Sequence, residues 1–432
     1  MNLKEKIINL YWFIKDKKLV VKSGEQPDFY FIYLPFNRGK IFVDVYIKAG
    51  ALTEEKNQAG IGHLLEHYIA GQIKEKSNGQ LVLEGKINDN HIIFSLTSNL
   101  KENLDEEINQ FLEGIFAPDF SDENKFKYEK QSIVNETNIE QHNLYQTIGR
   151  IIDKIRYLDE PNGRSFVDHL SSLEKLTLED IKKYHQKIFS NSNLKIFLSG
   201  HNVNKKIINL IKEKSPITLL SKKYITFPDP QYSSFSTQNQ IEPGIDGYYT
   251  CLTFPGLNQK STRKERLVLS LLVDIITSFD KNGLYKQVRE VGIYDLSTDF
   301  HVGIKNGFFW IRSYLTDGQF TSWLKIISDS LNKFKRGEID QAIIDLIKKH
   351  WLIDGLNYWR SNDGRFDRLS NLIIEGDEIQ SWSDVEKIIQ SIQVDDLAKV
   401  AQKIFDRSRA NLIIYGEESK LDQKEIEKLL DF

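Results

Sequence analysis

The sequence predicts an α+β protein built from two homologous α/β sandwich-like domains, each a sheet packed against helices. Two observations support this fold class. Stretches with the apolar alternation of strands and stretches with helical periodicity follow one another along the 432 residues. One such stretch in the first half recurs in the second half, and the chain is long enough for two or three domains with sizeable cores.

The recurring stretch runs from Asp180 to Gly200 and again from Asp396 to Gly416, which align without a gap at an offset of 216 residues. Each copy has the pattern of a helix that leads into an apolar strand and then a glycine. Identical residues at matching positions include Lys183, Gln186, Lys187, Ile188, Phe189 and Ser192 of the first copy. Two copies of one domain explain the match, and coincidence in a chain rich in Lys and Ile is the alternative.

The domain boundaries follow from this repeat and from a change in composition. Residues 215–247 are rich in Pro, Ser, Gln and Tyr and show little periodicity. We therefore expect an N-terminal domain over residues 1–220, an interdomain linker over 221–245 and a homologous C-terminal domain over 246–432.

The elements of the first half can be assigned in order. A stretch rich in Tyr, Phe and Ile predicts a strand over 28–36, alternating apolar residues predict one over 41–47, and further strands are expected over 80–85, 91–97 and 194–198. Helical periodicity predicts helices over 60–76, 104–115, 143–158 and 204–214, and another that begins at Ser121 as N-cap and carries Glu129 and Glu136. Two further helices precede the 194–198 strand, and the residues up to Lys18 form an amphipathic N-terminal segment.

Composition excludes several classes of protein. The net charge of -3 argues against a surface for nucleic acid or anionic membrane, and no apolar run approaches the ~20 residues of a membrane span. The single cysteine, Cys251, excludes a disulfide framework and a zinc site built from cysteines. Lys4 and Lys6 precede an apolar run, but Asn9 interrupts it and no small-residue cleavage site follows. We expect a cytoplasmic protein.

The residues that best indicate a chemical function lie at the start of the 60–76 helix. The sequence there reads His63-Leu64-Leu65-Glu66-His67. His63 and His67 are four residues apart, so both imidazoles lie on one helix face, with Glu66 beside them. Two such histidines form half of a zinc site, and an adjacent carboxylate can deprotonate a metal-bound water. The alternative is a chance pentapeptide on a solvated helix.

A zinc peptidase needs a third protein ligand from another element. Glu136 lies 69 residues after His67, and Glu129 lies seven residues before Glu136, so both carboxylates share one helix face. One acid as ligand with a second behind it suits a zinc site, although most isolated glutamates are solvated.

These residues together resemble the pitrilysin, insulysin and mitochondrial processing peptidase family of inverted zincins. Further matches extend the resemblance over nearly the whole chain. They are Gly50-Ala51 with Glu54 or Glu55, Gly60, Gly163, Leu173–Gly200, Cys251–Gly256 and Gly283–Glu290.

The resemblance implies a role for each matching residue. Zinc, one ion per chain, would be held by His63, His67 and Glu136. Glu66 would be the general base and Glu129 would support the site from behind the ligands. Arg289 and Tyr294 of the second half would bind the substrate carbonyl and stabilise the oxyanion.

The resemblance also implies a zinc-dependent endopeptidase that cleaves peptides or unfolded segments inside a closed chamber. A half-length chain supplies two of the family's four domains, half of a clamshell. We therefore expect a homodimer, with a heterodimer with a related subunit as the alternative. The rival function is a non-catalytic peptide-binding or scaffold subunit.

Two departures from the family's pattern bear on substrate binding. Arg289 and Tyr294 are five residues apart where the family usually has seven. Leu83-Glu84-Gly85-Lys86 stands where the family tends to carry Asn-Ala-x-Thr, on the sheet edge that pairs with substrate. Main-chain pairing does not require particular side chains there.

Overall fold

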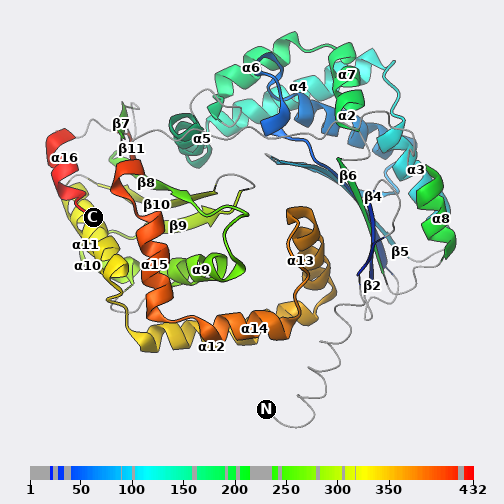
Figure 1. The fold of residues 1–432 in the computed structure, drawn as a ribbon. Helices are drawn as coiled ribbons and strands as arrows, with labels where there is room; N and C mark the ends of the chain where they lie inside the picture. The colour runs from blue at the N-terminus through cyan, green and yellow to red at the C-terminus, as the bar shows by residue number, and fades with distance from the viewer. Residues whose placement is uncertain are drawn as a thin grey trace, which may run out of the picture. The chain divides into compact units, whose positions relative to one another are not determined.

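A computed structural model describes residues 20–22, 28–33, 40–88, 90–99, 103–157, 163–189, 193–200, 205–214, 236–241, 246–278, 283–303, 307–316, 318–416 and 423–432 (Figure 1). The predicted amphipathic N-terminal segment lies outside these residues. The chain divides into two compact units. Unit 1 comprises Met1–Thr147, Asp159–Pro228 and Tyr358–Ser381, and unit 2 comprises Ile148–Leu158, Asp229–Asn357 and Trp382–Phe432.

Unit 1 is built on a six-stranded sheet with the order β1-β2-β6-β3-β5-β4. Its strands are β1 (Val20–Lys22), β2 (Asp28–Tyr33), β3 (Lys40–Ile47), β4 (Val82–Ile87), β5 (Ile92–Asn99) and β6 (Leu194–Gly200). β2 and β6 pair in parallel, and the other pairs are antiparallel. On β3 the alternating residues from Ile41 to Ile47 are buried on one face, as the sequence predicts, because a helical layer covers that face.

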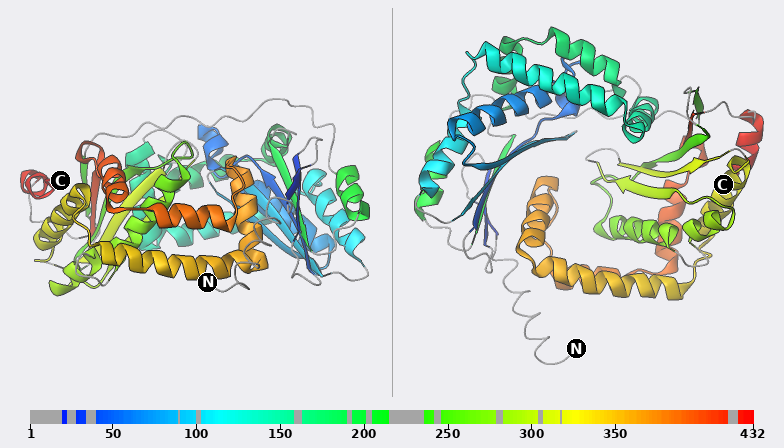
Figure 2. Two further views of the ribbon diagram at one scale, coloured as in Figure 1. Left: turned by 60° about the horizontal axis from the view of Figure 1, so that its bottom comes forward. Right: turned by 180° about the vertical axis from the view of Figure 1, so that it is seen from behind.

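Helices cover both faces of this sheet (Figure 2). One layer contains α2 (Ile61–Lys76), α3 (Leu104–Phe116), α4 (Glu123–Gln141), α6 (Phe166–Lys175), α7 (Leu178–Ile188) and α8 (Lys205–Lys214). On the opposite face lies α13 (Asn362–Glu375), where Phe366 stacks on Phe42 of β3 with ring centroids 6.0 Å apart. The second half of the chain therefore supplies a helix to the core of unit 1.

Unit 2 has a five-stranded sheet with the order β7-β11-β8-β10-β9. The strands are β7 (Ser236–Ile241), β8 (Tyr248–Gly256), β9 (Leu296–His301), β10 (Gly307–Leu315) and β11 (Asn411–Gly416). The helices are α9 (Arg263–Thr277), α10 (Leu284–Glu290), α11 (Phe320–Arg336), α14 (Trp382–Ser391), α15 (Val394–Ile404) and α16 (Gln423–Leu429), with most of α5 (Leu144–Tyr157) and α12 (Gln341–Arg360). None of the described helices is long and apolar enough to cross a bilayer.

The two sheets repeat one topology. In unit 1 a parallel pair, β2 and β6, is followed by antiparallel neighbours, and in unit 2 the parallel pair of β7 and β11 is followed in the same way. The recurring stretch forms α7 and β6 in unit 1 and α15 and β11 in unit 2. Phe189 and Phe405 end these helices at matching positions, and both are buried. The predicted fold class is thus confirmed.

Two local expectations differ from the structure. Asp122 rather than Ser121 is the N-cap of α4, because its carboxylate accepts a hydrogen bond from the N–H of Lys125 at 2.9 Å. Within the segment predicted as a linker, Ser236–Ile241 forms β7 and pairs with β11. This polar edge strand is held by main-chain bonds, so its side chains lack the apolar alternation of a strand. Residues 221–235 and 242–245 lie outside the described part of the chain.

Candidate metal centre

Glu54 anchors the start of α2, the helix that carries both histidines. Its carboxylate accepts hydrogen bonds from the N–H groups of Gly60 and Gly62 at 2.9 and 3.0 Å. Arg164 pairs with the same carboxylate at 3.2 Å, and both side chains are buried. The acid next in sequence, Glu55, is exposed and pairs with Lys187. Of the two acids that the sequence left open, Glu54 is therefore the one that fixes the helix.

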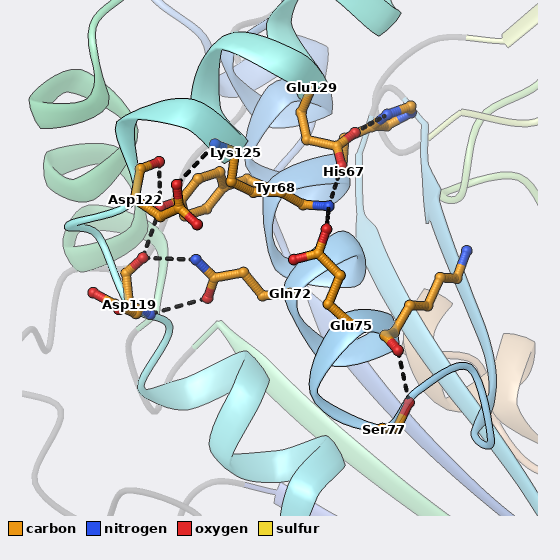
Figure 3. A network of polar contacts seen from close by, with 10 residues as sticks. His67, Tyr68, Gln72, Glu75, Ser77, Asp119, Asp122, Lys125 and Glu129 are labelled. Carbon is orange, nitrogen blue, oxygen red and sulfur yellow. Dashed lines mark hydrogen bonds and ion pairs between the residues drawn. The ribbon is translucent and has the colours of Figure 1, made fainter.

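A second set of bonds holds the beginning of α4 against α2 (Figure 3). The Tyr68 hydroxyl and the Gln72 amide both donate to the carbonyl oxygen of Asp119 at 2.6 Å, and the Asp119 N–H donates to Gln72 at 3.0 Å. Tyr68 and Gln72 are one turn apart on α2, so the segment that enters α4 is tied to one helix face. Glu129 and Glu136 of α4 consequently lie beside the histidines of α2.

His63, His67 and Glu136 form the only group of potential metal ligands found among the described residues, and their ligand atoms all lie within 4.8 Å of one another. Glu136 Oε2 is 3.7 Å from Nε2 of each histidine. Three atoms at about 2.0–2.1 Å from one zinc ion in tetrahedral arrangement lie about 3.3 Å apart. Two imidazoles and one carboxylate at this spacing fit zinc in donor type and size.

Glu66 lies beside the cluster and against the sheet. It is 6% exposed, and its Oε2 is 3.8 Å from Nε2 of His67. Its other carboxylate oxygen occupies the space that a side chain at position 85 of β4 would need. A Cβ on Gly85 would lie only 1.7 Å from this oxygen. β4 is one of the two edge strands of this sheet in the described part of the chain, so the buried carboxylate lies next to a sheet edge.

Glu129 supports His67 from the side away from Glu136. Its Oε2 is 3.4 Å from Nδ1 of His67, and Oε1 is 2.9 Å from the ammonium of Lys125. An ionised carboxylate only accepts hydrogen bonds, so this contact favours a proton on Nδ1, which would leave the Nε2 lone pair for a metal.

The surroundings shift the pKa values of these groups in different directions. Burial, aided by the charge of His67, lowers the pKa of His63 to about 4 and keeps its imidazole neutral. Burial would also lower the pKa of His67, but the hydrogen bond to Glu129 and the nearby carboxylates outweigh it and raise this pKa. Burial raises the pKa of Glu66, which moves this carboxyl toward the range in which a general base works near neutral pH.

Arg289 and Tyr294 lie together in unit 2. The guanidinium of Arg289 is 4.9 Å from the ring centroid of Tyr294 and 3.3 Å from the hydroxyl of Tyr285. Arg289 is exposed, and Tyr294 is 67% exposed. Unit 1 thus brings together the five residues predicted there, and unit 2 separately brings together the predicted Arg and Tyr.

Sequence reasoning missed three residues that shape the site: Gly71, Lys125 and Arg164. A signal existed for two of them. Lys125 precedes Glu129 by four residues and Gly71 follows His67 by four, so each shares a helix face with a predicted site residue. Arg164 meets the site only through tertiary contacts.

The fold agrees with comparisons to known proteins. The chain is 22% identical over 419 residues to the zinc protease PqqE of Helicobacter pylori, which covers 92% of each chain. It is 20% identical over 207 residues, 44% of each chain, to the beta subunit of the mitochondrial-processing peptidase of Saccharomyces cerevisiae. The fold matches a crystal structure of a protease from H. pylori with a TM-score of 0.79 at 19% identity, covering 92% of this chain and 98% of the other.

The family described as "Peptidase M16 inactive domain" matches residues 175–350. Residues 175–350 thus match an M16 domain, and the whole chain is similar to half-length, two-domain M16 proteins. The matched residues exclude the candidate metal cluster and Glu66, all of which precede residue 175. A structure of an M16 inactive domain from Pseudomonas fluorescens also shares the fold, with a TM-score of 0.80 at 16% identity over 93% of this chain and 99% of the other.

Proposed function

We propose that this protein is a zinc-dependent endopeptidase that cleaves peptides or unfolded polypeptide segments. One observation carries the proposal: the ligand atoms of His63, His67 and Glu136 converge within 4.8 Å, and the buried carboxylate of Glu66 stands beside them. The names of relatives called zinc proteases support the choice of metal.

Each residue of the cluster has a separate task. His63 and His67 offer neutral Nε2 atoms and Glu136 offers a carboxylate oxygen to one zinc ion. When bound, zinc supplies a Lewis acid that polarises a peptide carbonyl and makes a water molecule acidic. Glu66 accepts a proton on its carboxylate and delivers it to the nitrogen of the leaving amine. Glu129 keeps the proton of His67 on Nδ1.

The substrate would add a strand to β4. This edge strand has main-chain groups available for pairing, and Gly85 lies against Glu66, so a peptide paired there would pass close to the general base. Because main-chain bonds provide the binding, the altered residues from Leu83 to Lys86 would change side-chain preference rather than abolish binding. Arg289 and Tyr294 would contact the substrate carbonyl and the developing oxyanion.

The test combines metal analysis with a quenched-peptide assay on purified variants. His67→Ala should lose most of its zinc, because two remaining protein ligands hold the ion weakly. Glu66→Gln should keep zinc and fold but lose at least about 100-fold in kcat, because an amide cannot accept the proton. His142→Ala and Glu140→Gln, which change exposed residues near the end of α4, serve as matched controls and should alter neither measurement.

Two results would contradict the proposal. Full zinc retention by His67→Ala would refute the ligand set, and unchanged turnover of Glu66→Gln would refute the base. The rival function, a non-catalytic peptide-binding subunit, is favoured by the description of the family that matches residues 175–350. It predicts that wild-type protein binds peptides without cleaving them even when it is loaded with zinc.

We also propose that two copies of the chain form the active unit, with Arg289 of one copy serving the metal cluster of the other. The support is that the described residues of the chain contain one candidate metal cluster, in unit 1, and the Arg289–Tyr294 pair, in unit 2. A related peptidase is named as a subunit, so a heterodimer with a related chain is the alternative.

A further inference from the structure

A polar seam runs between α2 and α4. On α2, residues at intervals of four form one stripe that ends at an acid: His63, His67, Gly71 and Glu75. Across from it, α4 presents Glu136, Glu129 and Lys125 in the reverse order. The candidate metal cluster lies at one end of the seam, and the ion pair of Lys125 with Glu75 lies at the other.

Glu129, in the middle of the seam, has a different partner for each carboxylate oxygen. Oε2 accepts from Nδ1 of His67 at 3.4 Å, and Oε1 pairs with the ammonium of Lys125 at 2.9 Å. The side chains of Glu129 and Lys125 are each only 9% exposed, so water has little access to replace either contact. As Figure 3 shows, Lys125 reaches across to α2 and also contacts Glu75. The ammonium therefore holds one oxygen of the Glu129 carboxylate while the other oxygen faces His67.

Gly71 provides the room for this arrangement. A Cβ at Gly71 would lie 2.5 Å from Oε1 of Glu129, 2.6 Å from Cε of Lys125 and 2.8 Å from its Nζ. Any side chain at this position would push the ion pair away from α2. Glycine is a poor helix former. Its place in the middle of α2 is explained by this packing requirement.

We infer that Lys125, seated over Gly71, is a positioning residue that sets the zinc affinity of the cluster through Glu129 and His67. The inference rests on the proposed zinc site but not on peptidase activity. Lys125 contacts none of the proposed ligands. It acts by holding the carboxylate that orients His67, and loss of such supporting partners typically costs 10–100-fold in metal affinity.

Whether removal of Lys125 weakens or strengthens zinc binding distinguishes a positioning role from a purely electrostatic one. Removing a cation near a divalent ion should strengthen metal binding if the charge acts only through space. Positioning predicts the opposite result, because a buried Glu129 without its ammonium no longer presents Oε2 to His67 in a fixed orientation.

The experiment measures the zinc dissociation constant by competition with a chromophoric chelator. Lys125→Met should weaken zinc binding about tenfold. Gly71→Ala should weaken it without any change of charge, and alanine favours the helix, so poor helix formation could not explain the loss. Lys127→Met is the matched control: it removes the same charge from an exposed position on α4 and should leave the dissociation constant within about twofold.

A double-mutant cycle tests whether Lys125 acts through Glu129. The variant with both Lys125→Met and Glu129→Gln should bind zinc no more weakly than the weaker single variant, because both changes remove one function. Full additivity, or wild-type affinity in Lys125→Met, would overturn the inference. If Glu129→Gln and His67→Ala weaken zinc binding while Lys125→Met does not, the proposed zinc site stands and only the inference fails. If neither of those variants changes zinc binding, both fail.

Discussion

At the scale of single residues, Asp44 is a carboxyl group buried inside the sheet of unit 1. It lies on the face of β3 that α13 covers and is 5% exposed. Burial raises its pKa to about 7, the charges of Asp367 and Glu84 add to this effect, and a hydrogen bond from Ser95 together with the charge of Lys86 opposes it. The group is therefore largely protonated in the folded chain at mildly acidic pH.

We predict that Asp44 makes unit 1 less stable as the pH rises. Its folded pKa lies above that of the unfolded chain, near 4, so the folded state binds more protons between these values. The free energy of unfolding should fall as the pH rises from about 4 to about 7, by about 4 kcal/mol at most, and stay reduced above that. Asp44→Asn should remove this loss.

Chemical denaturation at pH 5 and pH 8 measures the effect. The free energy of unfolding of Asp44→Asn should exceed that of wild type by more at pH 8 than at pH 5. Asp354→Asn, which changes an exposed acid on α12, should show the same pH dependence of stability as wild type. An Asp44→Asn protein whose stability varies with pH as the wild-type protein does would contradict the assignment.

At the scale of elements, the start of α2 depends on one buried ion pair. Glu54 satisfies two N–H groups that the first turn of a helix leaves without partners, and Arg164 balances its charge. Glu54→Gln should lower the free energy of unfolding by about 3–5 kcal/mol, because Arg164 is left buried without a charged partner.

The neighbouring acid provides the comparison. Glu55→Gln removes an exposed ion pair with Lys187 and should cost about 0.5 kcal/mol or less. Urea denaturation of the two variants measures the difference. Equal small losses would show that the Glu54 pair does not hold the helix.

At the scale of the whole molecule, the proposed dimer makes a prediction about mixing. Glu66→Gln and Arg289→Ala chains should each be nearly inactive. If Arg289 acts on the partner's cluster, a mixed dimer contains one site with both wild-type residues, and equal mixing should restore about a quarter of wild-type activity under random pairing. A peptidase assay after subunit exchange measures this recovery.

The alternative, in which Arg289 acts within its own chain, predicts a different result of mixing. If Arg289 serves the cluster of its own chain, every site in the mixture carries one lesion and no activity returns. Mixing Glu66→Gln with His67→Ala is the matched control: both lesions lie in unit 1, so no site regains a complete cluster and activity should stay low. A fully active monomer, seen by light scattering, would refute the dimer.

The periodic and local parts of this protein could be predicted from its sequence. Strand β3 carries a clear apolar alternation, and the duplication is visible as a repeat from Asp180 and from Asp396. His63, Glu66 and His67 share one helix face because helical geometry alone puts them there. Glu136 and Glu129 were assigned as their partners only through a family resemblance, since residue spacing says nothing of which helices pack together.

Tertiary structure decided whatever depends on contacts between distant segments. β7 carries no apolar alternation because a polar edge strand needs only main-chain bonds to β11. Glu54 rather than Glu55 holds α2 because only Glu54 meets Arg164, 110 residues away. Lys125 reads as an ordinary surface lysine until α2 and α4 pack and Gly71 admits it. Periodicity along a chain reports which face an element buries, whereas partners across elements are selected by packing and charge in three dimensions.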